Sequence, residues 1–322
     1  MTAPPPIPAT RHVAERLNPH FGFYLGNNTL LAERQSPWQH IEVLENPQFG
    51  LVMRIDGAFM TSERDEFFYH EPMVHLPAIA HPGVRRALVV GGGDGGAAEE
   101  LLKLPTIERV VMAELDAEVV AMARQWLGHI HRGAFDDPRF TLHLGDARTF
   151  IAQTDERFDQ IVLDLTDPFG PAIELYTVEF YRACRQVLNP GGVVSLHLGS
   201  PIHLQESMRR IGASLRAVFP VFRPFLQYVP LYGTLWCMAM ASDSNDPVGL
   251  SAAAVDARLA ERGIGDLQLY NGAMHQALLA QPNFVRALFA QPAQPLHSGD
   301  VLSDVRDPAE LPPIRVSEGE AF

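Results

Sequence analysis

Five acidic residues stand at the ends of predicted strands, where carboxylates can do chemistry. The first, Asp94, lies inside the glycine-rich stretch LVVGGGDGGAAEELL. The other four are Glu114, Asp146, Asp164 and Asp167. Neighbouring parallel strands end at the same edge of a sheet, and ligands bind in the crevice there, so we expect these side chains to line one site.

The glycines around Asp94 have the spacing of a nucleotide-binding loop. Gly91, Gly93 and Gly96 satisfy the pattern G-x-G-x-x-G, with a predicted strand before them and a predicted helix after them. Glu114 ends the next predicted strand, in VVMAELD, where an acid can accept hydrogen bonds from ribose hydroxyls. The pattern therefore predicts a ligand that contains a ribosyl nucleoside.

The charge of Asp94 narrows the class of nucleoside. A pyrophosphate binds at a helix N-terminus because the N–H groups and the helix dipole favour negative charge, and a carboxylate in the loop would repel it. This disfavours NAD and FAD and favours a sulfonium nucleoside, either S-adenosylmethionine or its decarboxylated relative. A helix-capping role for Asp94 is compatible with ligand contact. Asp146, after TLHLG, is placed to accept from an adenine amine.

Two further acids point to an amine as the nucleophile. Asp164 and Asp167 lie three residues apart in VLDLTDPFGP, a stretch rich in turn formers. A primary amine has a pKa of about 10 and must lose a proton before it attacks carbon. One carboxylate can accept that proton while its neighbour holds another ammonium group. Aspartates are also common in turns, but five acids at four strand ends favour chemistry.

Strands and helices alternate through the part of the chain that carries these acids. Strands are predicted at 86–91, 109–114, 139–144, 158–164 and 192–198, and helices at 95–104, 117–127, 147–154, 176–188 and 202–218. This rhythm predicts a largely parallel sheet with helices on both faces. The apolar stretches FLQYVP and TLWCMAMAS are expected to extend the sheet as an antiparallel pair, and a helical segment follows them.

The rest of the chain divides into an N-terminal region and a tail. Alternating apolar residues with turn signals at Asn46-Pro47 and Asp56-Gly57 predict a small antiparallel β domain over 40–63. The predicted organisation is as follows: a flexible, proline-rich segment at 1–12, a β domain at 13–75, a Rossmann-like α/β domain at 76–290, and a polar tail at 291–322.

Composition excludes several classes of function. The formal charge of −13 and the lack of a basic stripe disfavour a nucleic-acid partner. No apolar run approaches the roughly 20 residues of a membrane span, and MTAPPPIPATRH does not resemble a secretory signal. The only cysteines, Cys184 and Cys237, fit a reducing cytoplasm, and neither has a partner at metal-ligand spacing. His70 and His75 are five residues apart, unlike the pair in a zinc-binding H-E-x-x-H.

From about residue 39 to 290 the chain resembles the polyamine aminopropyltransferases, the spermidine synthase family. The resemblance is carried by DGAFMTSERDEFFYHEPMVHLP, VVGGGDGG, FDDPRFTLHLGDARTF, VLDLTDPFGPAIELYT and YNGAMHQALLAQPNF, in that order. It implies a methyltransferase-like fold and transfer of the aminopropyl group of decarboxylated S-adenosylmethionine to an amine, with release of methylthioadenosine. It also implies no metal, no bound cofactor and a homodimer or homotetramer.

The resemblance assigns site residues. It implies that the donor and its nucleoside contact Gln39, Gly91, Gly93, Asp94, Glu114, Asp146, Ala147 and Pro171. It implies that the polyamine contacts Tyr69, His70, Asp94, Asp164, Asp167 and Tyr232, with Asp164 as the proton acceptor.

Most departures from the family pattern fall on the acceptor side. They are Met60, Pro72, Glu174, the stretch VPLYGTLW and, on the nucleoside side, Ala147. Putrescine is the expected acceptor. Spermidine, agmatine, cadaverine or a longer polyamine are alternatives, because Glu174 could neutralise one more ammonium. An amine N-methyltransferase that uses S-adenosylmethionine and a non-catalytic polyamine or nucleoside sensor also stay open, while Asp94 disfavours an NAD-dependent oxidoreductase.

Overall fold

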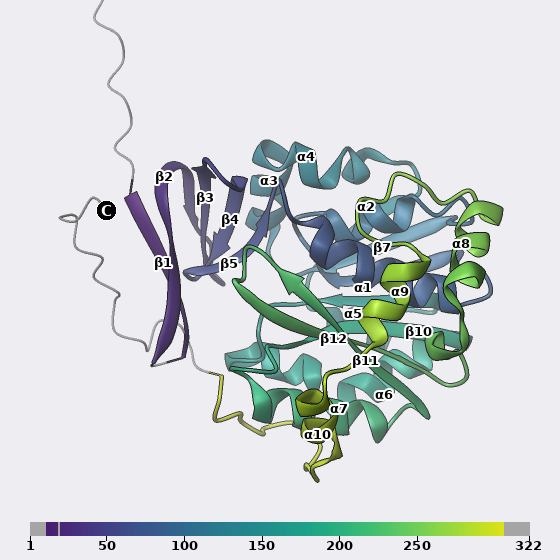
Figure 1. Ribbon diagram of the computed structural model, residues 1–322. Coiled ribbons are helices and arrows are strands. Elements are labelled where there is room, and N and C mark those ends of the chain that lie inside the picture. Colours follow the sequence, from purple (N-terminus) through teal and green to yellow (C-terminus); the bar gives the residue numbers. More distant parts are fainter. Residues whose placement is uncertain (1–10, 19, 306–322) are drawn as a thin grey trace, which may run out of the picture.

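The structure, a computed structural model, describes residues 11–18 and 20–305. It contains two sheets, an N-terminal antiparallel sheet and a larger, mostly parallel one wrapped by helices (Figure 1). The predicted fold class is therefore confirmed. Residues 1–12 were predicted to be flexible. Arg11 and His12 instead begin the first strand, and residues 1–10 lie outside the described residues.

The N-terminal sheet has five strands in chain order. They are β1 (Arg11–Asn18), β2 (Phe21–Gln35), β3 (His40–Asn46), β4 (Gly50–Ile55) and β5 (Ala58–Ser62). The turn from β4 to β5 passes through Asp56 and Gly57 with φ of 50° and 83°, the left-handed conformation that a tight hairpin requires. The predicted β region at 40–63 is confirmed, and β1 and β2 extend it to residue 11.

The larger sheet has the strand order β11-β12-β10-β9-β6-β7-β8. Its strands are β6 (Arg86–Gly91), β7 (Arg109–Glu114), β8 (Phe140–Leu144), β9 (Phe158–Asp164), β10 (Leu188–Gly199), β11 (Val221–Val229) and β12 (Thr234–Ser242). The strands from β10 to β8 pair in parallel, while β12 pairs antiparallel with both β10 and β11. The predicted terminal antiparallel pair is present.

Helices cover both faces of this sheet. They are α1 (Phe67–Ala80), α2 (Gly96–Leu102), α3 (Ala117–Trp126), α4 (Gly128–His131), α5 (Ala147–Gln153), α6 (Val178–Val187), α7 (Gln205–Arg216), α8 (Ala252–Glu261), α9 (Gly272–Leu279) and α10 (Asn283–Ala290). Short 3-10 turns lie at η1 (Ala134–Asp136), η2 (Gly170–Tyr176) and η3 (Pro247–Gly249). The helix predicted at 176–188 starts at Val178, where the Thr177 hydroxyl accepts from the N–H of Phe180.

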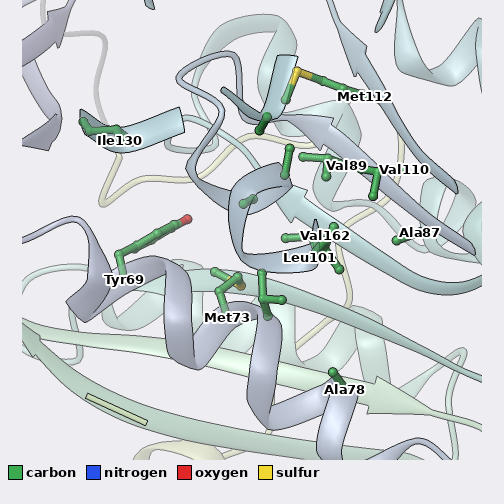
Figure 2. Packing of buried hydrophobic residues seen from close by; sticks show 14 of the residues in the cluster. Tyr69, Met73, Ala78, Ala87, Val89, Leu101, Val110, Met112, Ile130 and Val162 are labelled. Atoms are coloured by element: carbon green, nitrogen blue, oxygen red, sulfur yellow. The ribbon is translucent and has the colours of Figure 1, made fainter. Parts of the chain in front are cut away.

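The core has a layer on each face of the sheet. One layer, part of which Figure 2 shows, packs Met73 of α1 and Leu101 of α2 with Val162 of β9. The other layer packs Leu163, the next residue of β9, with side chains of α6 and α7. Since successive strand residues face opposite sides, a run of apolar residues in β9 serves both layers.

Helix α1 links the two sheets. It follows β5 closely and packs against β9, β10, β11 and β12, so the domain boundary predicted after residue 75 falls inside this helix. The helix continues through Pro72. In the predicted tail, Leu296 and Leu302 are buried, and residues 306–322 lie outside the described residues. Among the helices that the structure describes, none is both long and apolar enough to cross a membrane.

Candidate functional site

A cavity of about 690 Å³ lies at the carboxyl ends of β6, β7, β8 and β9. Residues of the N-terminal sheet, including Glu15 of β1, form part of its wall. Every site residue named from the sequence lines this cavity: Gln39, Tyr69, His70, Gly91, Gly93, Asp94, Glu114, Asp146, Ala147, Asp164, Asp167, Pro171 and Tyr232. The structure thus brings together the five acids that the sequence placed at strand ends.

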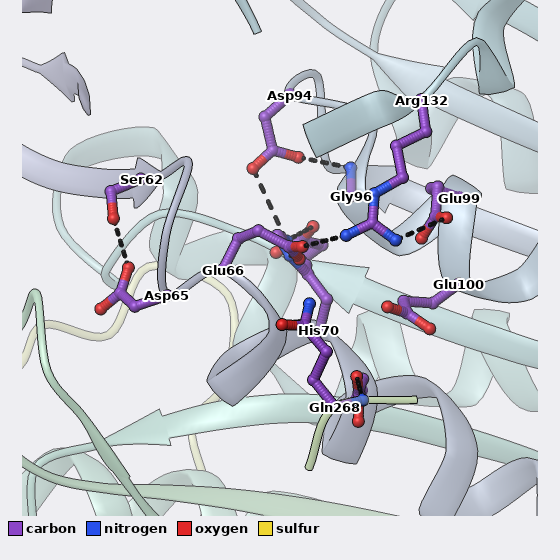
Figure 3. A network of polar contacts seen from close by, with 12 residues as sticks. Ser62, Asp65, Glu66, His70, Asp94, Gly96, Glu99, Glu100, Arg132 and Gln268 are labelled. Atoms are coloured by element: carbon purple, nitrogen blue, oxygen red, sulfur yellow. Dashed lines mark hydrogen bonds and ion pairs between the residues drawn. The ribbon is translucent and has the colours of Figure 1, made fainter. Parts of the chain in front are cut away.

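The glycine loop brings two strand ends together. Gly91 has a φ of 76°, and a Cβ on it would overlap the carbonyl oxygen of Asp164. The N–H of Gly92 donates to that carbonyl over 2.9 Å. Asp94 accepts from the N–H of Gly96 with Oδ1 over 3.0 Å, while its Oδ2 faces His70 (Figure 3). The carboxylate of Asp94 therefore caps α2 and faces the site at the same time.

The nucleoside end of the cavity contains Glu114 and Asp146. Burial raises the pKa of Glu114 to about 7, and its Oε1 accepts from the N–H of Asp116. Gln39 donates its amide to Asp116 over 2.9 Å, which fixes the Gln39 side chain beside Glu114. Asp146 caps α5 through the N–H of Arg148 and is about half exposed. These groups offer hydrogen-bond acceptors to ribose hydroxyls and to an exocyclic amine.

His70 is buried in the centre of the acidic cluster. Its Nδ1 lies 2.9 Å from Oε2 of Glu66, and its Nε2 lies 3.5 Å from Oδ2 of Asp94 and 3.8 Å from Oδ2 of Asp164. Burial alone would lower the pKa of His70, but Asp94, Glu66 and Asp164 together raise it to about 10. At neutral pH the ring is therefore a cation that partly balances the carboxylates around it.

Asp164 has the properties of a proton acceptor. Burial and the neighbouring Asp94 raise its pKa to about 6, against the lowering effects of His70 and of a hydrogen bond from Tyr69. Burial, followed by the charge of Asp164, raises the pKa of Tyr69 well above its usual value, so this hydroxyl stays a donor. Asp164 is therefore ionised at neutral pH and more basic than an exposed aspartate, as a general base requires.

The far end of the cavity holds two more acids. Burial raises the pKa of Asp167. Burial also raises the pKa of Glu15, to about 8, and the charge of Asp167 adds to this effect. A hydrogen bond from the N–H of Phe59 acts in the opposite direction. That N–H donates to Oε2 of Glu15 over 2.6 Å. Tyr232 lies nearby, with its hydroxyl donating to the Met60 carbonyl. Nothing in the sequence marks Glu15 as a site residue, because no motif surrounds it and the strand signals begin only at residue 40.

Glu174, which the sequence suggests as a partner for an extra ammonium group, lines the cavity but is already engaged by other parts of the chain. Its Oε2 accepts from the hydroxyl of Ser298 over 2.8 Å and its Oε1 from the N–H of Gly299 over 3.0 Å. Arg148 lies 3.6 Å away as an ion pair. Both oxygens thus bind the chain itself.

His70, Asp94 and Asp164 also offer ligand atoms within 4.8 Å of one another, close enough to hold a metal ion. A ring nitrogen must be unprotonated to bind a metal. Because its neighbours raise the pKa of His70 to about 10, the ring carries a proton at neutral pH, which a metal ion would have to displace.

Comparison with known proteins agrees with this chemistry. A family model described as "Spermine/spermidine synthase domain" matches residues 66–252, and one described as "Spermidine synthase tetramerisation domain" matches residues 13–63. A polyamine aminopropyltransferase of Nitrosomonas europaea is 61% identical over 97% of both chains. One of Sodalis glossinidius is 38% identical over 84% of this chain and 94% of its own.

Solved structures show the same likeness. A spermidine synthase in complex with the transition-state analogue AdoDATO superposes with a TM-score of 0.81 at 32% identity, covering 87% of this chain and 96% of that one. The spermidine synthase of Thermotoga maritima superposes with a TM-score of 0.78 at 31% identity and the same coverage. The chain therefore belongs to the spermine/spermidine synthase family and is a polyamine aminopropyltransferase.

Proposed function

We propose that this enzyme transfers the aminopropyl group of decarboxylated S-adenosylmethionine to putrescine, giving spermidine and methylthioadenosine. One observation carries the proposal: the carboxylates of Asp94, Asp164 and Asp167 face one cavity beside the nucleoside acids Glu114 and Asp146. A row of negative groups favours a donor that is positive at its sulfur and at its amine, together with an acceptor that is positive at both ends.

The donor is proposed to bind with its adenosine toward Glu114 and Asp146 and its amine toward Asp94. Gln39, Ala147 and Pro171 complete the nucleoside end, and the backbone of Gly91 and Gly93 leaves room for it. A carboxylate on the donor would face Asp94 at close range, which disfavours S-adenosylmethionine as the substrate. No metal or bound cofactor is required, because the sulfonium itself supplies the leaving group.

In the proposed reaction, Asp164 takes one proton from the attacking ammonium group of the acceptor. The freed lone pair attacks the carbon next to the sulfonium, the carbon–sulfur bond breaks, and its electron pair stays on sulfur as a neutral thioether. The nitrogen keeps its two remaining hydrogens and becomes a secondary ammonium. Tyr69 and His70 hold Asp164 in place by a hydrogen bond and by charge. Positioning and electrostatics therefore supply most of the rate.

The acceptor end supports a diamine. Asp167 lies beyond Asp164 and can hold the second ammonium of putrescine. The carboxyl of Glu15, whose pKa burial raises to about 8, offers a neutral hydrogen-bond acceptor beside it at neutral pH. Tyr69 and Tyr232 contact each other edge to face at 6.1 Å and offer an apolar wall to the carbon chain. Glu174, which would favour a third ammonium, is occupied by Ser298 and Gly299. These contacts favour putrescine over spermidine.

A panel of amines tests the proposal. Decarboxylated S-adenosylmethionine is incubated with putrescine, cadaverine, agmatine and spermidine in turn, and methylthioadenosine release and product mass are followed. We expect the highest kcat/KM with putrescine and a product that has the mass of spermidine. A higher kcat/KM with another amine would replace putrescine as the acceptor. Methylated amine formed from S-adenosylmethionine, or no turnover at all, would overturn the proposed reaction.

We also propose that the enzyme is a cytoplasmic homodimer or homotetramer. Residues 13–63, which match the tetramerisation domain, form the five-stranded sheet. Phe21 and Tyr24 of β2 in this sheet are 45% and 53% exposed, which is typical of a contact surface. Light scattering on the purified protein is expected to give a mass of two or four chains, and a monomer would refute the assembly.

A further inference from the structure

The segment after α10 forms a C-terminal strap (residues 296–305) that runs along the large domain toward the N-terminal sheet. Figure 1 shows it in yellow, passing α7 on its way to the side of the molecule where β1 lies. The strap contains no helix or strand. Its path is therefore fixed by contacts with other elements, and these contacts lead to the substrate cavity.

The first half of the strap is fastened to α6, α7 and η2. Leu296 is fully buried, its N–H donates to the hydroxyl of Ser214 over 2.8 Å, and its carbonyl accepts from the N–H of Val178. Ser298 and Gly299 then bind both oxygens of Glu174. Since η2 also lines the cavity, this half ties the strap to one wall of the site.

The second half of the strap caps helix α7. The helix begins after Leu204, whose side chain cannot cap it, and its first N–H groups need acceptors from elsewhere. The carboxylate of Asp304 accepts from the N–H of Glu206 over 2.6 Å and from the N–H and hydroxyl of Ser207. Arg210 holds the strap one turn later, through Asp300. Asp304 therefore has a fixed position at the start of α7.

The strap ends at the acceptor end of the cavity. Val305, which follows Asp304, lines the cavity together with Leu204 and packs against both layers of the core. Asp304 is close enough to Asp167 for its charge to raise the pKa of that residue. In the sheet, β9 and β10 lie on the opposite side of β6 from β8. Asp146 follows the end of β8, whereas Leu204 follows the end of β10. Val305 is thus remote from the nucleoside end.

We propose that the strap forms part of the acceptor subsite and that the side chain of Val305 limits the length of the amine that the enzyme accepts. This inference rests on the proposed function, because it assumes that the acceptor lies beyond Asp164. The chemistry is that of an apolar stop: in a diamine that is too long, the terminal ammonium extends past Asp167 and Glu15 and meets the valine methyl groups. The strap holds the stop in place through Asp304 and Glu174.

Two substitutions at one position test the stop. Val305→Phe lengthens it, and Val305→Ala shortens it. A methylene too many or too few in an apolar pocket changes kcat/KM by about 10- to 200-fold. We expect Val305→Phe to lower kcat/KM for cadaverine at least about tenfold more than for 1,3-diaminopropane, mainly through KM. Val305→Ala is expected to shift the ratio of cadaverine to putrescine in the opposite direction.

Val301→Phe is the matched control, because Val301 belongs to the same strap and is 78% exposed. It is expected to leave the ratios unchanged, and all three variants are expected to bind methylthioadenosine as the wild type does. If Val305→Phe lowers kcat/KM by one factor for every amine, or if Val301→Phe gives the same shift, the stop is refuted. A wild-type enzyme that transfers to none of the amines would instead refute the proposed function, so the two failures are distinguishable.

Discussion

Replacing Asp164 by asparagine separates proton transfer from binding. The amide has nearly the same shape as the carboxylate and can still accept the Tyr69 hydrogen bond through its oxygen, but it cannot take a proton from an amine. General-base catalysis contributes typically about 10² to 10⁴ in rate, which is about 2.7 to 5.4 kcal/mol of barrier at 1.36 kcal/mol per tenfold. We expect kcat to fall by a factor in this range.

The structure also says what the substitution leaves unchanged. Asp94 and Glu66 still flank His70, so the ring keeps two of its three anionic neighbours and stays charged. Glu114 ends β7 and Asp146 follows β8. The charge of Asp164 adds only a small contribution to the raised pKa of Glu114, which burial dominates. Because methylthioadenosine is neutral at its sulfur, its affinity is expected to change less than about threefold, which is about 0.65 kcal/mol at 1.36 kcal/mol per tenfold.

The assay is methylthioadenosine release at saturating donor and acceptor, with methylthioadenosine affinity measured by calorimetry on the same preparation. Asp167→Asn is the matched control from the same turn, and it is expected to raise the KM of the diamine more than it lowers kcat. In the wild type, kcat/KM is expected to rise with pH through about 6, where Asp164 loses its proton, and the variant is expected to lack this limb. Near-normal turnover of Asp164→Asn would show that another group is the base.

Three further predictions test the surroundings of this base. Burial raises the pKa of Glu15 to about 8 in the folded protein, against about 4.5 when unfolded. The stability that protonated Glu15 contributes to the wild type is therefore full below about pH 4.5 and is lost as the pH rises through about 8. Relative to the wild type, the melting temperature of Glu15→Gln is expected to increase as the pH is raised from about 5 to about 9. A constant difference would contradict this. Gly96→Ala is expected to abolish most activity, because the new Cβ would overlap the His70 ring. Gly128→Ala serves as the control in the same assay, because a Cβ at residue 128 would have no other atom within 4 Å. Glu71→Gln is expected to lower the free energy of unfolding by about 1 to 3 kcal/mol in urea titrations. The buried carboxylate of Glu71 accepts hydrogen bonds from three successive backbone N–H groups, and the amide nitrogen of glutamine cannot accept a hydrogen bond. An unchanged midpoint would show that those N–H groups find other partners.

The sequence predicted the large sheet well, because its signals are local. Apolar runs such as that of β9 bury both faces, glycines mark the turns after β6 and before β12, and hydroxyl or carboxyl caps begin α3, α5 and α6. The acids at the strand ends were found for the same reason: parallel strands end at one edge, so strand ends that are distant in the chain become neighbours. The start of α6 was placed two residues early, because η2 precedes it and shares its composition.

What the sequence did not reveal depends on contacts between distant segments. In β1 only Val13 is fully buried and the other side chains are partly or fully exposed, so the strand lacks a clear apolar alternation, and nothing local indicates that Glu15 enters the cavity. The strap is fixed by hydrogen bonds to Glu174, Arg210 and the start of α7, none of which leaves a periodic pattern. The part that Glu174 plays in anchoring the strap was therefore not evident from the sequence.

The charges of the site also indicate the order in which products leave. Before transfer, the donor carries positive charge at its sulfur and its amine, and Asp94 and Asp164 attract both. Transfer removes the charge from sulfur and moves the aminopropyl ammonium to the other product. If the proposed function is correct, methylthioadenosine would then be held only by hydrogen bonds at Glu114, Asp146 and Gln39, while the spermidine would keep three ammonium groups near Asp94, Asp164, Asp167 and Glu15, all of which line the cavity. Because the charged product alone retains the electrostatic attraction of the cavity, its release is expected to be the slower of the two at low ionic strength and to become faster as salt screens the carboxylates.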